Sequence, residues 1–227
     1  MIIPSRPLLK ISGTLIAEAW KKNDLAHIKD IYYKSCINQF IIGGFLFLGI
    51  WANIDNILSI LGEDYLQSKW VIFFISLGYL FDMLTGANAQ VIAFSKYYRV
   101  SLLFIVILIV LVISLLAVLI PAWGITGAAI AIAGALLLNN IMRYLFLYKK
   151  YKLQPFNSKF IVIAVFYTSV FFLIRLVPQK ELVPDLILRS VLIVLFTVSF
   201  FWFVPLSADI TSVRNTLVSY LRKIIAK

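Results

Sequence analysis

The residues best suited to chemistry are polar groups inside two otherwise apolar stretches. In the first, GYLFDMLTGANAQVIA, Asp82 and Thr85 are three positions apart and share one face of a helix. In the second, Asn139, Asn140 and Arg143 follow a long apolar run. A carboxylate near the middle of a bilayer costs about 2.5–3.5 kcal/mol on insertion scales, so it is expected to face a bundle interior or a water-filled cavity. We therefore take Asp82, Thr85, Asn139 and Arg143 as candidates for a substrate or ion cavity.

Each of these residues also has a structural interpretation. Asp82 could form a hydrogen bond between helices with an amide such as that of Asn139. Arg143 could extend its guanidinium to the cytoplasmic headgroups, or face a cavity and bind an anionic group such as a lipid pyrophosphate. Asn88 and Gln90 lie closer to the cytoplasmic end, where hydration at the membrane surface is expected.

The composition requires a membrane around these residues. The chain has 227 residues, of which 62% are hydrophobic and 14% charged, against about 45–50% and 25% in soluble domains. Crossing the hydrocarbon core takes about 20 helical residues. Six stretches qualify: 37–53, 70–94, 100–120, 124–147, 160–177 and 186–205. The predicted fold is an all-α bundle of six transmembrane helices (37–207), between a cytoplasmic elbow (1–36) and a basic amphipathic tail (208–227).

Loop charge predicts the orientation of this bundle. Lys and Arg in short loops mark the cytoplasmic side of a membrane protein. Of the 21 basic residues, the external loops of the six-span arrangement hold only Lys69, Arg175, Lys180 and Arg189. This alternation places both termini in the cytoplasm.

The two flanking segments are expected to lie at the membrane surface. Asp24 can cap a helix with one apolar face, which would lie on the inner surface and turn into the first span. The tail carries a helical apolar stripe beside basic residues, a pattern typical of helices that bind anionic lipid. The stripe consists of Ile210, Val213, Leu217, Leu221 and Ile224.

Small residues predict which spans pack closely. Gly127, Ala131 and Gly134 share one face of 124–147, in line with Gly124, and Gly78 and Gly86 lie on the Asp82 face of 70–94. Because lipid provides no hydrophobic drive for helix association, small side chains promote it by letting backbones approach. The bulky span 100–120 is expected to face lipid, with a tight external turn at residues 121–124.

Enzyme chemistry has no recognisable motif in the chain. It lacks a GxxxxGK[ST] nucleotide loop, HExxH, GxSxG and an aspartate-rich metal motif. It has one His and one Cys, too few for a cysteine-based metal cluster or a disulfide. Once the spans are removed, no soluble basic patch interleaved with aromatics remains for nucleic acid. We therefore expect a non-enzyme without cofactor, metal or nucleic-acid partner.

The order of these features resembles the C-terminal part of oligosaccharide flippases of the multidrug/oligosaccharidyl-lipid/polysaccharide exporter superfamily. The similar segments are an elbow at 15–35, an external ILSILGEDY, a basic AFSKYYR loop, and the most specific block, IPAWGITGAAIAIAGALLLNNIMRYLFLYKKYKLQPF at 120–156. Residues 15–156 carry the resemblance, and the last two spans match only in hydropathy.

The resemblance implies translocation of a polyprenyl-pyrophosphate-linked oligosaccharide across the bacterial cytoplasmic membrane by alternating access, for surface polysaccharide such as the O-antigen of lipopolysaccharide. Such proteins have two six-helix lobes around a central cavity. The chain is short for that, so we expect a fragment whose N-terminal lobe is missing, or a subunit that pairs with a partner.

Two other functions fit the same sequence. One is a cation-coupled small-molecule exporter of the same superfamily, for which drug sensitivity on deletion would be diagnostic. The other is a non-transporting membrane scaffold of a polysaccharide assembly complex, which would co-purify with a glycosyltransferase or polymerase.

Overall fold

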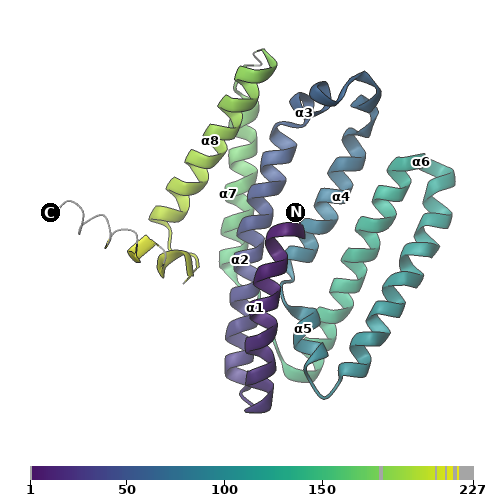
Figure 1. The fold of residues 1–227 in the computed structure, drawn as a ribbon, viewed down its shortest axis with the longest axis vertical. Coiled ribbons are helices and arrows are strands. Elements are labelled where there is room, and N and C mark those ends of the chain that lie inside the picture. The colour runs from purple at the N-terminus through teal and green to yellow at the C-terminus, as the bar shows by residue number, and fades with distance from the viewer. Residues whose placement is uncertain (1, 179–180, 208, 213, 217–218, 220–227) are drawn as a thin grey trace.

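The computed structural model describes residues 2–178, 181–207, 209–212, 214–216 and 219. All the labelled elements in this part of the chain are helices (Figure 1). They are α1 (Ile2–Lys21), α2 (Leu25–Ala52), α3 (Ile54–Leu61), the 3-10 helix η1 (Glu63–Ser68), α4 (Lys69–Leu84), α5 (Asn88–Ala93), α6 (Tyr98–Tyr151), α7 (Ser158–Arg175) and α8 (Leu182–Phe203).

Helix α2 is longer than its predicted membrane span. Asp24 caps its N-terminus by accepting a 2.9 Å hydrogen bond from the His27 backbone N–H. The predicted turn before residue 37 does not occur, because no Gly or Pro interrupts the chain before Gly43. The buried face begun by Ile28 and Tyr32 continues into the apolar part of the helix. α1 runs beside this first half of α2 (Figure 1), so the predicted elbow consists of a helix pair.

The predicted span 70–94 is divided into two helices. α4 ends at Leu84, and Gly86, with φ +55°, turns the chain before α5 begins at Asn88. A Cβ on Gly86 would lie 2.7 Å from the Cys36 backbone N in α2. Only glycine adopts this conformation readily and allows this approach, so Gly86 fixes the interruption and brings α2 against it.

Helix α6 is a hairpin of two limbs (Figure 1). The chain reverses at Gly124, whose φ of 56° and ψ of −136° are not helical. Three residues on, a Cβ on Gly127 would lie 2.0 Å from the Leu119 carbonyl oxygen of the other limb. The predicted turn at 121–124 is therefore confirmed, with Gly124 in the turn itself.

The two limbs have different surroundings. The first limb is exposed along most of its length, with Leu102, Val106 and Ile113 at least half exposed, as predicted for a lipid-facing helix. The second limb packs on α4, where a Cβ on Gly78 would lie 2.7 Å from the Ala133 Cα.

Among the predicted packing residues of the second limb, Ala131 is fully buried. Gly134 differs, because a Cβ there would have only an ordinary contact of 3.8 Å, to Leu115. Its small size is not required by a neighbouring backbone.

Helices α7 and α8 cover the opposite side of α2 (Figure 1). The Tyr167 hydroxyl of α7 donates a 2.7 Å hydrogen bond to the Ile41 carbonyl. Its ring lies on Gly44, where a Cβ would be 2.5 Å away. α8 packs on α7 through stacked Phe166 and Phe200 rings, whose centroids are 3.9 Å apart.

Four helices in the described part of the chain are long and apolar enough to cross a membrane: α2, α6, α7 and α8. This supports a multi-pass membrane protein. The loops at 22–24, 94–97 and 152–157 gather at one end of the molecule, here called the basic end, and α3, the α6 turn and the α7–α8 connection lie at the other (Figure 1).

One charge assignment changes with the structure. Arg189, counted with the external loop charges although it falls in the predicted span 186–205, lies within α8 and is buried. In the tail, residues 209–212, 214–216 and 219 are helical. Val213, Leu217, Leu221 and Ile224 lie outside the described residues, so the tail stripe remains a prediction.

Candidate functional site

Four polar side chains meet where α4 ends, and we call them the Asn140 cluster: Asp82, Thr85, Asn88 and Asn140. The Asn140 amide nitrogen donates to Asp82 Oδ1 at 2.9 Å. Its oxygen accepts from Asn88 Nδ2 at 2.8 Å and lies 2.9 Å from the Thr85 hydroxyl. Asn140 thereby joins α6 to α4, to the break and to α5.

The helix break makes this meeting possible. The Thr85 N–H still bonds to the Phe81 and Asp82 carbonyls, so α4 holds its last turn up to the break. After Gly86 the chain starts α5, and its first residue, Asn88, turns its amide to Asn140. Asn140 Nδ2 also donates to the Leu136 carbonyl at 3.1 Å, so both its amide protons and its oxygen are used.

The Asn140 cluster lies toward the basic end. Asp82 is 13 residues after Lys69, the first residue of α4, which corresponds to about 20 Å of helix at 1.5 Å per residue. Asp82 therefore lies in the last turn of α4, on the side of the basic end. Asp82 is half-buried, while Asn88 and Asn140 are 2% exposed. Asp82 and Thr85 are thus the more accessible members of the group.

The other two predicted site residues form a separate contact on the same limb. With its amide oriented to satisfy both neighbours, Asn139 donates to the Phe104 carbonyl at 3.0 Å and accepts from Arg143 Nη2 at 3.2 Å. Arg143 is half-buried and interacts electrostatically with Asp82. The structure therefore brings Asp82 and Thr85 together directly, and Asn139 and Arg143 together beside them.

Sequence reasoning missed two members of the Asn140 cluster. Asp82 bonds to Asn140 where Asn139 was suggested, and Asn88, expected to be hydrated at the membrane surface, is buried. One signal was available for Asn140: it follows Ala133 by seven residues, so it shares the face that packs on Gly78 of α4. Asn88 had no comparable signal, because its position depends on the break at Gly86.

A second buried group, the Arg189 cluster, lies at the opposite end and consists of Asn56, Asp185 and Arg189. Arg189 Nε and Asp185 Oδ2 form an ion pair of 2.6 Å, and both side chains are almost fully buried. Asn56 of α3 donates to the same carboxylate oxygen at 2.7 Å. Arg189 also donates to the Ile174 and Val177 carbonyls at 3.3 and 3.2 Å, so it closes the C-terminal end of α7. The i,i+4 spacing of Asp185 and Arg189 was a usable signal.

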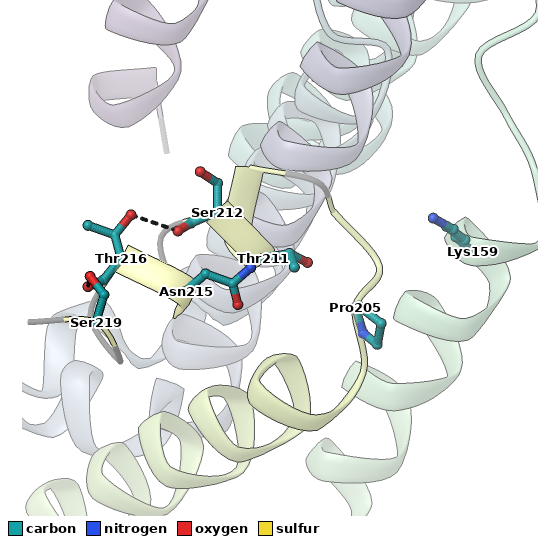
Figure 2. Close-up of a pocket in the computed structure, with 7 residues that line it drawn as sticks. All are labelled: Lys159, Pro205, Thr211, Ser212, Asn215, Thr216 and Ser219. Atoms are coloured by element: carbon teal, nitrogen blue, oxygen red, sulfur yellow. Dashed lines mark hydrogen bonds between the residues drawn. The ribbon is translucent and has the colours of Figure 1, made fainter. Parts of the chain in front are cut away.

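A polar pocket of about 710 Å³ lies between the start of α7 and the segment after α8 (Figure 2). Lys159 comes from α7, and Thr211, Ser212, Asn215, Thr216 and Ser219 come from the segment after α8. Its hydroxyl groups bond within their own segment, as Thr216 does to the Ser212 carbonyl at 3.0 Å, and Lys159 Nζ bonds to the Leu206 carbonyl. The pocket presents no group of converging charges, and we assign it no role.

The residues that the structure describes contain no group of three or more His, Cys, Asp or Glu side chains that could hold a metal ion. The comparisons with known proteins add no family: no protein-family model, curated protein or solved structure matches the chain.

Proposed function

We propose that this chain is the C-terminal part of a flippase for polyprenyl-pyrophosphate-linked oligosaccharides, in which the Asn140 cluster and Arg143 face the transport path. The observation that carries the proposal is a carboxylate in the apolar helix α4 and a guanidinium in the apolar helix α6, both half-buried and close enough to interact. Ionisable groups in membrane spans usually mark substrate or ion pathways, because their insertion is otherwise unfavourable. The lipid-linked oligosaccharide is proposed as the substrate because residues 15–156 resemble oligosaccharide flippases.

In this proposal the chain crosses a bacterial cytoplasmic membrane six times, with both termini in the cytoplasm. The crossings are α2, α4 with α5, each limb of α6, α7 and α8. The basic end is then cytoplasmic, in agreement with the positive-inside rule. A missing N-terminal lobe or a partner subunit completes the cavity.

The helix break supports a transport role. In many transporters, discontinuous helices supply the substrate and ion contacts, because an interrupted backbone leaves polar groups available within the membrane. Here the break at Gly86 lies between Thr85 and Asn88, and Asp82 is in the turn before it. Arg143 supplies the positive charge that a pyrophosphate would need, from the same region of α6.

The test is complementation of a deletion in the organism that encodes the chain. Cells with the deletion are expected to lose surface polysaccharide and to accumulate its lipid-linked intermediate. Wild-type gene should restore export, whereas Asp82→Asn with Arg143→Gln should not. The matched control is Asp30→Asn with Lys34→Gln, which removes an exposed ion pair of 2.7 Å on α2 and should restore export fully.

Other outcomes would select another function. Export at wild-type levels by the Asp82/Arg143 variant, with no accumulated intermediate on deletion, would refute the proposal. Sensitivity to toxic small molecules on deletion would favour a cation-coupled exporter. Co-purification with a glycosyltransferase or polymerase, without bound lipid-linked substrate, would favour a scaffold.

A further inference from the structure

The two ends of the α6 hairpin form a basic corner at the basic end of the molecule, made of Lys96, Arg99, Lys150 and Lys152. Lys96 lies just before α6 and Arg99 in its first turn, whereas Lys150 lies in its last turn and Lys152 directly after it. All four side chains are exposed. The hairpin thereby brings together cations that are more than 50 residues apart in sequence.

Tyrosine rings hold these cations in place. Lys96 Nζ and Lys150 Nζ lie 5.4 and 5.5 Å from the centroid of the same ring, Tyr97. That ring is fixed by edge contacts with Phe146 and Tyr151. Because an aromatic face attracts a cation within about 6 Å, Tyr97 gathers two lysines from the two ends of the hairpin.

Acidic residues are absent from the whole surrounding segment. Between Asp82 and Glu181 the sequence contains no Asp or Glu. Among the residues that the structure describes, the ion pairs involve none of the four cations of the basic corner. Among the described residues, these like charges are therefore concentrated there without an ion-pair partner.

Exposed apolar stripes begin at the same corner. On the first limb, Arg99 is followed along one face by exposed Leu102 and Val106, and on the second limb exposed Ile141 and Leu145 lead toward Lys152. Both stripes run from the basic corner into the apolar length of α6. This places an anion-binding surface at one end of a surface suited to hydrocarbon chains.

We propose that the basic corner binds the headgroup of an anionic phospholipid, with its acyl chains along the exposed stripes of α6. The phosphate lies between Lys96 and Lys150, and the tyrosines mark the level of the headgroups. The inference rests on the proposed crossing of the membrane by α6. It does not depend on the cargo of the transporter, so its failure would leave the proposed function standing.

The experiment measures lipid binding to the purified full chain by native mass spectrometry. Wild-type protein is titrated with phosphatidylglycerol and with phosphatidylcholine of the same acyl chains. We expect wild type to prefer the anionic lipid, and Lys96→Gln with Lys150→Gln to weaken its binding by about 25-fold, taking about fivefold for each lysine near an anionic surface. The matched control, Lys10→Gln with Lys29→Gln, removes two lysines outside the corner and should keep the preference.

Three results would overturn the proposal. The first is equal binding of the two lipids by wild type. The second is equal weakening by both double variants, which would indicate diffuse attraction between the net charge of +11 and any anion. The third is complete displacement of phosphatidylglycerol by inorganic phosphate at equal concentration, which would indicate a site for a free anion without a role for the acyl chains.

Discussion

The Asn140 cluster and the Arg189 cluster both bury polar side chains between helices, and they balance their charge differently. In the Arg189 cluster the Asp185 carboxylate has its cation at 2.6 Å and an amide at 2.7 Å. In the Asn140 cluster the Asp82 carboxylate accepts from a neutral amide at 2.9 Å. Asp185 is 2% exposed, whereas Asp82 is half-buried.

Because of this difference, the Arg189 cluster holds helices together, whereas the carboxylate of the Asn140 cluster can exchange its hydrogen-bond partners. A buried ion pair completed by hydrogen bonds is costly to break, because removing one member leaves a buried charge. The half-buried Asp82 carboxylate accepts from one neutral amide and interacts with Arg143 without a direct ion pair, so it can change partners at lower cost. The comparison indicates that the Arg189 cluster stabilises the fold, whereas the Asp82 carboxylate of the Asn140 cluster can exchange its hydrogen-bond partners.

The largest expected effect is that of Arg189→Met. It leaves the buried Asp185 carboxylate without its cation, and we expect a loss of about 3–5 kcal/mol in the free energy of unfolding. Unfolding by SDS can be followed through the thiol of Cys36, which is fully buried in the folded chain. The double variant Asp185→Leu with Arg189→Met should unfold close to wild type, because no charge is left unpaired. A double variant as unstable as Arg189→Met alone would contradict the assignment.

Gly86→Ala should destabilise the Asn140 cluster through its backbone. A side chain at φ +55° costs about 1–3 kcal/mol in strain, and the 2.7 Å approach to the Cys36 backbone N adds to it. Tryptophan fluorescence during SDS unfolding measures the change. The matched control is Gly49→Ala in α2, where a Cβ would meet nothing within 4 Å. That variant should be neutral or slightly stabilising, and equal unfolding midpoints for the two variants would disprove the role given to Gly86.

Asn140→Leu removes the three hydrogen bonds that join α6 to α4 and α5. Interhelical hydrogen bonds in membranes average about 0.6 kcal/mol each, so we expect a loss of about 2 kcal/mol. Asp82→Asn should change stability by less, because its amide oxygen can still accept from Asn140. An Asp82→Asn variant less stable than Asn140→Leu would mean that the carboxylate charge holds the helices together. The reactivity of the Cys36 thiol during SDS unfolding measures the stability of both variants.

The smallest effect is expected for the exposed pair of Glu18 and Lys22, which has the same i,i+4 spacing as Asp185 and Arg189. The hydrogen bond from Lys22 lowers the pKa of Glu18. Any stabilisation of the folded chain by this pair is therefore present at pH values above the pKa of Glu18 in the unfolded chain. It is lost as the pH falls through the lower pKa of Glu18 in the folded chain. Because both side chains are exposed, Glu18→Gln should leave the unfolding midpoint unchanged at pH 7 and pH 4. A clear shift at pH 7 would show that burial is not what distinguishes the two pairs.

The sequence predicted what depends on local chemistry. The reversal at residues 121–124, the exposed first limb and the close packing at Gly78 and Gly127 follow from residue size and from turn-forming residues. The polar stretches around Asp82 and Asn139 also proved to be neighbours in space.

What the sequence missed depends on contacts between distant elements. The break at Gly86 is set by α2, 50 residues away, and without it Asn88 cannot be placed. Asn139 and Asn140 point about 100° apart on the helix, so the choice between them depends on how α6 sits on α4. Arg189 was counted as a loop charge because loop counting does not recognise a pair buried within a helix.

The tight turn at Gly124 has a consequence for biosynthesis. It leaves no long loop between the two limbs of α6, so in the proposed six-crossing arrangement they would enter the membrane as one helical hairpin. The first limb consists largely of Leu, Ile and Val, each of which favours insertion by about 0.3–0.6 kcal/mol. The favourable insertion free energy of the first limb compensates for the unfavourable insertion of the asparagines and the arginine of the second limb. The exposed limb that contributes least to internal packing is therefore the one that carries the polar residues into the bilayer.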